Sequence, residues 1–252
     1  MPDHRLPVPR AKAVVALFLT FAAGYVDIVG FLRVAHTFTA HMTGNTVHLG
    51  NHMIREDWHR LAITGAALLA FILGSIAGRA IIEIGSRRRF RRIASLTLFF
   101  EAVLLSVAIL VSWTAIPGAF MLELVVVLAG AMGLQTATLT RVGPLTIHTT
   151  FVTGMLNKLA QLLSHGLFLF YDGIMGKCQL RALRRKVMHD ALYIFSIWLM
   201  YLVGAIVGAA LASSTGLRCL FLPVAILIAA IAIDQLRPFS LQEEREEVNQ
   251  AA

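Results

Sequence analysis

The chain has 252 residues, of which 58% are hydrophobic and 14% are charged. Soluble domains are less apolar and carry about 25% charged residues, so this composition argues against a water-soluble protein and for a membrane protein. In a soluble domain, the formal net charge of +8 would indicate nucleic-acid binding. Here the basic residues lie in short loops between apolar runs, where they are typical of topology signals and anionic-lipid contacts, so we expect no nucleic-acid partner.

Six apolar runs are each long enough to cross a bilayer as a helix. They cover residues 13–32, 62–84, 93–113, 119–140, 191–211 and 217–234. Because lipid offers the backbone no hydrogen-bond partner, segments of this kind span the membrane as helices. We therefore predict an all-α fold, a polytopic transmembrane helix bundle with about six spanning helices. This bundle forms a single transmembrane domain over residues 13–235.

The two ends of the chain are polar. Residues 1–12 form a short basic segment. The apolar run that follows is long for a signal peptide and contains Asp27, so we expect it to be retained as the first transmembrane helix. The charged tail, residues 236–252, is predicted to be disordered.

The basic residues are distributed unequally between the two sides of this bundle. Fifteen lysines and arginines lie before the first run, between the second and third, between the fourth and fifth, and after the sixth. Four lie on the other side. Because cytoplasmic loops carry the excess of lysine and arginine, we expect a multi-pass protein of the bacterial inner membrane with both termini in the cytoplasm.

Several motifs recur along the chain. The glycines Gly74 and Gly78 recur as Gly204 and Gly208, and the first Thr-Gly pair recurs as Thr153-Gly154. This recurrence predicts a duplication, with one repeat over residues 13–113 and a longer one over 119–235, the extra residues falling in a basic loop at 171–190. A repeat of three spanning helices must be inverted in the membrane, as in many transporters. Chance resemblance between glycine-containing apolar helices is the alternative.

The two Thr-Gly pairs lie in runs of small and hydroxyl residues that apolar packing does not require. The first run is centred on residues 38–45 and the second on 149–157. The first is too rich in polar side chains to face lipid, so we predict broken or re-entrant helices buried in protein, or an extracellular helix lying on the bundle. If both segments crossed the membrane fully, the bundle would have eight helices and parallel repeats.

Polar groups in these segments are candidates for binding an ion or a small polar solute. Glycine lets a helix break, and the freed amides and hydroxyls can then contact a ligand. Close helix packing through small residues is the alternative. The candidate binding residues are Asp27, Thr43, Gly44, Asn45, Gln135, Thr153, Gly154 and Asn157.

Asp27 is the most informative of these residues. A carboxylate within a membrane helix is costly and should face the bundle interior, so we expect Asp27 to be an ion or proton partner, with Gln135 as its counterpart in the second half. A buried structural hydrogen bond to Gln135, Arg33 or a helix end would also explain it. Glu101 and Glu123 are weaker candidates of the same kind.

Histidines crowd the region around the first Thr-Gly pair. They are His36, His41, His48, His52 and His59. Two histidines four residues apart on a helix can share a metal ion. The second Thr-Gly segment does not repeat them, which favours a polar face towards water or a cavity. We expect no metal, no cofactor and no catalytic residues.

Four short motifs together form a distinctive pattern. They are Gly24-x-x-Asp27, Phe38-x-x-x-Met42-Thr43-Gly44-Asn45, Gly133-Leu134-Gln135 and Thr150-Phe151-Val152-Thr153-Gly154. With this pattern, nearly the whole chain, from about residue 13 to 235, resembles the YoaK-like family of bacterial integral membrane proteins. The resemblance implies a polytopic cell-membrane protein of a domain family without an assigned function, and it supplies no substrate. The His-rich region 36–59 and the basic loop 171–190 depart from the family pattern.

Three classes of function fit these features, and a small-solute or ion permease fits best. Its ligand would bind at the interface of the two halves, between Asp27 and the Thr-Gly segments. A non-transporting membrane scaffold or accessory subunit is the main alternative, because small-residue helix faces and arginine-rich loops fit it too. An intramembrane enzyme would need a polar pair such as Asp27 with His41, so we expect no enzyme. The expected partners are the lipid bilayer, an unknown small solute or ion, and a second copy of the chain in a homo-oligomer.

Overall fold

The computed structural model describes most of the chain. The described residues are 10–88, 90, 92–114, 120–138, 141–142, 145–146, 150–174 and 181–236. Most of the predicted N-terminal segment and the tail from residue 237 onwards lie outside these ranges. The predicted disorder of the tail is therefore not tested.

The described residues form helices, with one short pairing of two strands. The helices are α1 (Arg10–Arg33), α2 (Met42–Ile54), α3 (Trp58–Arg87), α4 (Ile93–Thr114), α5 (Met121–Thr138), α6 (Val152–Ile174), α7 (Arg181–Thr215) and α8 (Phe221–Leu236), with a 3-10 helix, η2 (Gly216–Leu220), between the last two. Strands β1 (Arg141–Val142) and β2 (Leu145–Thr146) pair antiparallel. Apart from these four strand residues, the predicted all-α fold is confirmed for the described part of the chain.

Within the described residues, five segments are long and apolar enough to cross a membrane. They are Lys12–Arg33, Trp58–Arg87, Ile93–Trp113, Met121–Thr138 and Ala182–Leu236. The fifth segment contains two helices, α7 and α8, joined by η2. Each of the six predicted apolar runs falls on one of these segments, and the last two runs share the fifth. The bundle is therefore a multi-pass membrane fold.

Glycines determine how the helices of the bundle cross. The closest packing joins α3 to α5 and α1 to α7. A Cβ atom at Gly74 would lie 2.2 Å from the carbonyl oxygen of Gly130, and one at Gly204 would lie 2.1 Å from that of Phe21. No side chain fits at such a distance, so glycine is what lets the two backbones meet.

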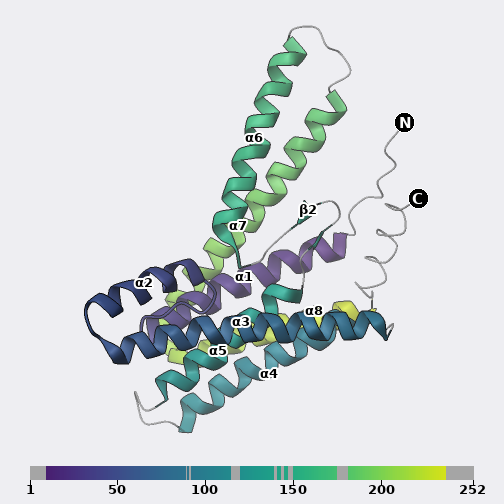
Figure 1. Ribbon diagram of the computed structural model, residues 1–252. Helices are drawn as coiled ribbons and strands as arrows, with labels where there is room; N and C mark the ends of the chain where they lie inside the picture. Colours follow the sequence, from purple (N-terminus) through teal and green to yellow (C-terminus); the bar gives the residue numbers. More distant parts are fainter. Residues whose placement is uncertain are drawn as a thin grey trace.

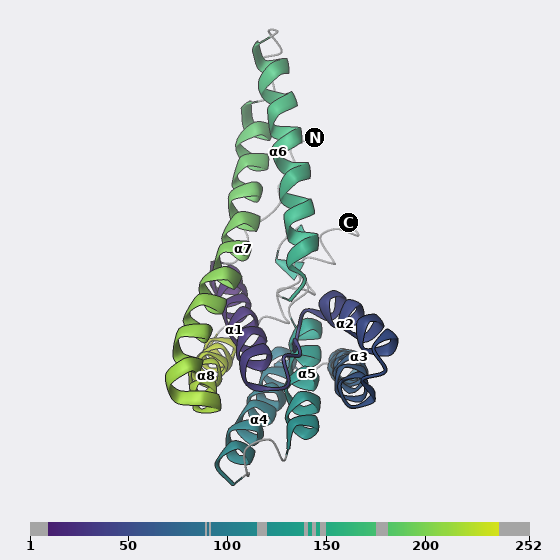
Figure 2. The same ribbon diagram turned by 90° about the vertical axis from the view of Figure 1, so that its left-hand side faces the viewer.

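The helices that begin with the Thr-Gly pairs, α2 and α6, lie outside this crossing pattern. Helix α2 packs on α3, and α6 packs on α7. In Figure 1, α6 and the first part of α7 form a hairpin that projects from the bundle, and Figure 2 shows the same projection after a quarter turn.

The predicted basic loop at 171–190 is helical throughout its described part, residues 171–174 and 181–190. Helix α6 continues to Ile174, and α7 already begins at Arg181. Val187 and Ala191 are buried four residues apart on α7, which packs on α6. The loop prediction is therefore wrong for this stretch, because the charges around these residues lie on the exposed side of a packed helix.

Candidate functional site

The first Thr-Gly segment turns back into the bundle. Helix α1 ends at Arg33, and the chain reverses through Ala35 and His36, which have positive φ angles of 55° and 51°. Residues 39–41 then bond to Asp27, which lies six residues before the end of α1. At 1.5 Å per helical residue, the segment therefore re-enters the bundle by about 9 Å before α2 begins.

The Asp27 carboxylate holds this re-entrant segment in place. Its Oδ1 accepts the backbone N–H groups of Thr39 and Ala40, both at 2.7 Å, and of His41 at 3.3 Å. Its Oδ2 accepts the hydroxyl of Tyr201 on α7 at 2.7 Å. Only 4% of Asp27 is exposed. The carboxylate thus lies beside the turn that leads into α2, where the backbone amides of residues 39–41 converge on it.

The other partners considered for Asp27 bond elsewhere. Arg33 donates to the carbonyl of Ala212 on α7. Gln135 is buried on α5 and donates from Nε2 to the carbonyl of Leu19 at 2.6 Å. Of the structural alternatives for Asp27, the structure therefore shows the bond near a helix end, because residues 39–41 lead directly into α2.

Asn45 and Gly44 complete the first segment. Asn45 is fully buried, and its side-chain amide donates to the carbonyl of Phe38 at 2.7 Å and accepts the Phe38 N–H at 3.0 Å. A Cβ atom at Gly44 would lie 2.4 Å from Cδ2 of His41. Both residues therefore shape the turn into α2, while the Thr43 side chain stays exposed.

The described part of the second Thr-Gly segment, from Thr150 onwards, makes a hydroxyl contact with α5. Thr150 is buried, and its hydroxyl lies 2.8 Å from the hydroxyl of Thr136 on α5. A Cβ atom at Gly154 would lie 2.0 Å from Cε1 of Phe151, so Phe151 covers this glycine as His41 covers Gly44. Asn157 is exposed one turn further along α6.

A cavity of about 350 Å³ separates the two segments. Four consecutive residues of each segment line it, residues 40–43 and 150–153, together with Phe71 of α3 and Thr136 of α5. The structure thus brings the candidates Thr43 and Thr153 onto one cavity.

The other candidates do not line this cavity. They are Asp27, Gly44, Asn45, Gln135, Gly154 and Asn157. The first five shape or support the surrounding backbone, and Asn157 is exposed on α6. Phe71 and Thr136 were missed, although a threonine beside Gln135 in an apolar helix was a usable signal.

Both helix crossings have a close contact at a glycine on each of their two helices. Besides Gly204 on α7, the crossing of α1 with α7 uses Gly24, where a Cβ atom would lie 2.1 Å from the carbonyl oxygen of Tyr201. Besides Gly74 on α3, the crossing of α3 with α5 uses Gly133, where a Cβ atom would lie 2.2 Å from the carbonyl oxygen of Phe71. The two crossings are therefore built in the same way.

The contacts of the two crossings correspond to one another pair by pair. The contact of Gly24 with Tyr201 corresponds to that of Gly133 with Phe71, and the contact of Phe21 with Gly204 corresponds to that of Gly130 with Gly74. Between α1 and α5, the two correspondences shift the residue number by the same amount. The same is true between α3 and α7. At the shift from α1 to α5, Thr136, and not Gln135, occupies the position of Asp27.

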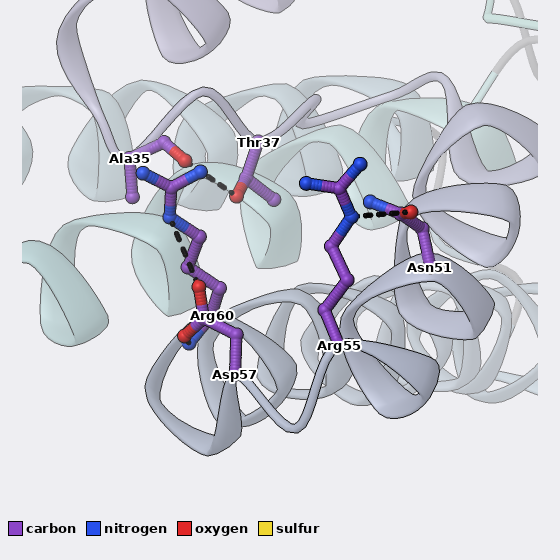
Figure 3. Close-up of polar contacts among 6 residues, drawn as sticks. All are labelled: Ala35, Thr37, Asn51, Arg55, Asp57 and Arg60. Atoms are coloured by element: carbon purple, nitrogen blue, oxygen red, sulfur yellow. Dashed lines mark hydrogen bonds and ion pairs between the residues drawn. The ribbon is translucent and has the colours of Figure 1, made fainter.

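The outer end of the first segment is fixed by local polar contacts. Asp57 precedes α3 and accepts the N–H of Arg60 at 3.1 Å, and Arg55 donates from Nε to the side chain of Asn51 at 3.1 Å (Figure 3). These contacts stabilise the turn from α2 to α3, and none of these residues lines the cavity.

The histidines of this region pack as aromatic rings. The rings of His48 and His52 on α2 stack with centroids 6.0 Å apart, and His41 lies edge-on to Phe38 at 5.1 Å. Among the described residues, no group of three or more His, Cys, Asp or Glu side chains could hold a metal ion.

Comparison with known proteins identifies related sequences. The family model described as "Protein of unknown function (DUF1275)" matches residues 15–233. The chain is also 31% identical over 192 residues to the UPF0700 transmembrane protein YoaK of Bacillus subtilis (strain 168), covering 76% of this chain and 80% of that protein. No solved structure matches. The relative's name describes a transmembrane protein, in agreement with the spans found here.

Proposed function

This chain belongs to the YoaK-like DUF1275 family, and because membership of this family implies no particular activity, we propose a function from the geometry of the chain. We propose that the protein is a permease for a small solute. The solute binds in the cavity between the two Thr-Gly segments. The protein resides in the bacterial inner membrane with both ends of the bundle in the cytoplasm. In support, α1 begins and α8 ends at the same end of the bundle in Figure 1.

We propose further that the bundle consists of two inverted, related halves. The shared register of the glycine crossings supports this, because unrelated helix pairs have no reason to repeat the same shifts in residue number. In Figure 1, α1 and α5 run in opposite directions through the bundle, as an inverted duplication requires. Each half then contributes one Thr-Gly segment that follows its first helix.

The cavity is the observation that carries the proposal. In transporters with inverted repeats, ligands bind at the repeat interface, where interrupted helices expose backbone amides. Here the cavity lies between the starts of α2 and α6, and each Thr-Gly segment supplies four of its lining residues. Its volume of about 350 Å³ lies at the small end of the range for ligand sites.

The role of Asp27 differs from that of an ion partner. Both carboxylate oxygens are engaged by the donors of residues 39–41 and Tyr201, so an incoming cation would have to displace these contacts. We assign to Asp27 and Asn45 the task of holding the first segment in its re-entrant position. Thr43 and Thr153 then face the solute.

Osmotic swelling of proteoliposomes tests this function and requires no identified substrate. Vesicles containing the purified protein are placed in iso-osmotic solutions of sugars, amino acids, small organic acids and polyols. We expect faster swelling than in empty vesicles for one chemical class, with loss of the difference in Thr153→Trp, which fills the cavity. The matched control is Asn157→Trp on the exposed side of α6. Swelling equal to that of empty vesicles for every class would refute the permease.

A membrane scaffold or accessory subunit is the second candidate, and the projecting hairpin favours it. Helix α6 belongs to the projecting hairpin, and its residues Leu167 and Phe168 are 70% and 68% exposed. Such a surface needs lipid or a partner to cover it. If the protein is a scaffold, Leu167→Ser with Phe168→Ser releases a co-purifying membrane protein, whereas Thr153→Trp does not.

A further inference from the structure

We propose that Glu101 is a proton-binding site within the membrane, and that it couples the passage of the solute to the passage of a proton. The coupling rests on the proposed permease, whereas the proton site is a property of the bundle itself. Among the described residues, Glu101 differs from the other buried carboxyl groups in having no hydrogen-bond donor.

Glu101 lies on the inner face of α4, between apolar neighbours. It is 0% exposed, as are Leu98 and Leu105, which lie about one turn to either side. Neither of its carboxyl oxygens has a hydrogen-bond partner within the described part of the chain. At 1.5 Å per residue, Glu101 lies about 12 Å from the start of α4 and about 20 Å from its end. Rotation of the side chain alone therefore cannot bring the carboxyl group to water on either side of the membrane.

The other two buried carboxyl groups show what a structural role requires. Asp27 accepts hydrogen bonds from three backbone N–H groups and from the hydroxyl of Tyr201. Asp234 on α8 accepts the backbone N–H of Ser95 at 3.1 Å, and it also accepts the hydroxyl of that serine. Donors of this kind compensate a buried carboxylate for the loss of water. Because the described residues offer none to Glu101, the role that explains Asp27 and Asp234 does not explain Glu101.

The surroundings of Glu101 favour the neutral acid. Moving an ionised carboxylate out of water without a paired charge or donors costs far more than moving the neutral form. The carboxyl group therefore holds a proton in this conformation, as expected for an ionisable residue within a membrane helix that has a functional role. To release the proton, the group has to reach water or another acceptor, which requires movement of the surrounding helices.

Charged groups on the neighbouring elements lie away from Glu101. Helix α4 packs on α3, α5, α8 and η2. The buried titratable residues of these elements are Asp234, which bonds to α4 about 9 Å along the helix from Glu101, and Cys219. Cys219 follows Arg218, whose guanidinium lies 6.0 Å from the ring of Trp113 near the far end of α4. The other charged or titratable residues of these elements are exposed, and they are His59, Arg60, Arg79, Glu83, Arg87 and Glu123. Within the described residues, the proton is therefore held by Glu101 alone and not by a coupled pair.

Helix α5 connects Glu101 to the solute cavity. Helix α4 packs along α5, and Thr136 of α5 lines the cavity. A movement that brings Glu101 to water shifts α4 against α5 and so changes the cavity. The cavity is formed while Glu101 is buried, so one conformation holds both the proton and the solute. Both therefore cross in the same direction: a proton passes from the solution on the side of solute entry to an oxygen of Glu101, and then to the solution on the other side.

Infrared spectroscopy of the purified full chain tests the proton site. At neutral pH in a maltoside detergent, which has no carbonyl group, a protonated carboxyl group gives a C=O stretching band that ionised carboxylates lack. We expect this band in wild type and its loss in Glu101→Gln, because glutamine keeps the shape of the neutral acid and cannot release a proton. The matched control is Glu83→Gln, which should keep the band because Glu83 is exposed and pairs with Arg87.

Two results would overturn the proton site. They are the absence of this band in wild type and an unchanged band in Glu101→Gln. If Glu101→Gln does not fold, Glu101→Met takes its place, because methionine has a straight side chain of similar length without a carboxyl group.

Proteoliposomes with a trapped pH-sensitive dye test the coupling. The solutes of the swelling assay are added outside at equal pH on both sides, with potassium and valinomycin to dissipate charge, and the signal of empty vesicles is subtracted. For the class of solute that causes swelling, we expect the lumen to acidify in wild type and in Glu83→Gln, and not in Glu101→Gln. Acidification in folded Glu101→Gln equal to that in wild type would overturn the role of Glu101.

The outcomes separate the proton site from the permease. An infrared band that depends on Glu101, without swelling in any solution, would support the proton site and remove the permease. Swelling that Thr153→Trp blocks, but that leaves the lumenal pH unchanged in wild type, would support the permease and overturn the coupling.

Discussion

The two Thr-Gly segments share a local motif and differ in what the neighbouring helices offer them. The first is closed by a buried carboxylate and a tyrosine hydroxyl, from Asp27 and Tyr201. The second meets Thr136 and Phe71 at the equivalent positions and borders a cavity. Two residues on the neighbouring helices therefore distinguish the anchored segment from the segment that borders the candidate ligand site. The Thr-Gly motif alone does not distinguish the two segments.

Removing the anchor should have the largest effect. In Asp27→Ala, the buried N–H groups of residues 39–41 lose their acceptor, and we expect a loss of stability of about 3–5 kcal/mol. Thermal unfolding in detergent, with fluorescence size exclusion to follow the folded fraction, measures this loss. Asp27→Asn retains one acceptor oxygen and should lie between Asp27→Ala and wild type. Wild-type stability of Asp27→Ala would mean that the first segment is not held in this way.

If the proposed duplication holds, the two glycine crossings should respond alike. Gly74→Ala and Gly204→Ala each place a Cβ atom about 2 Å from a backbone carbonyl oxygen, and we expect each to cost about 1–3 kcal/mol. Gly50→Ala and Gly173→Ala are matched helical controls with nothing within 4 Å, and they should be neutral or slightly stabilising. A large difference between Gly74→Ala and Gly204→Ala in the same unfolding assay would count against two related halves.

The smallest effect should come from the second donor to the anchor. Tyr201→Phe removes one hydrogen bond to Asp27 and leaves the three backbone donors, so we expect a loss of about 1–2 kcal/mol. Phe71→Tyr adds a hydroxyl beside the cavity and serves as the reciprocal variant, with little change in stability. If Tyr201→Phe destabilised the protein as much as Asp27→Ala, the backbone donors would not be the main support of the carboxylate.

Composition and hydropathy were enough to predict the helices of the bundle. Each predicted apolar run lies on a candidate span, because the membrane leaves the backbone few alternatives. The polarity of residues 38–45 likewise predicted that this segment avoids lipid. The first turns of α7, from Arg181 onwards, were not predicted as a helix. Their packing depends on contact with α6, and the charged sequence of these turns gives no sign of that contact.

The site was harder to predict than the fold. Similarity of side chains aligned Asp27 with Gln135, whereas the glycine contacts shift the register by one residue to Thr136. The cavity itself depends on contacts between Thr136 and Thr150 and on the position of Phe71 in a separate helix. Such tertiary contacts leave no local pattern in the chain, so Phe71 and Thr136 could be assigned only from the structure.

The most direct test of the central claim asks whether the two segments face one solute pathway. Thr43→Cys and Thr153→Cys are combined in full-length protein carrying Cys178→Ser and Cys219→Ser, and a short bifunctional thiol reagent is applied in proteoliposomes. Mass spectrometry of the digested protein measures the cross-link. The matched pair is Thr43→Cys with Asn157→Cys, because Asn157 does not line the cavity. We expect a cross-link and blocked swelling for the first pair alone, whereas a folded first pair that neither cross-links nor loses swelling would contradict a shared cavity.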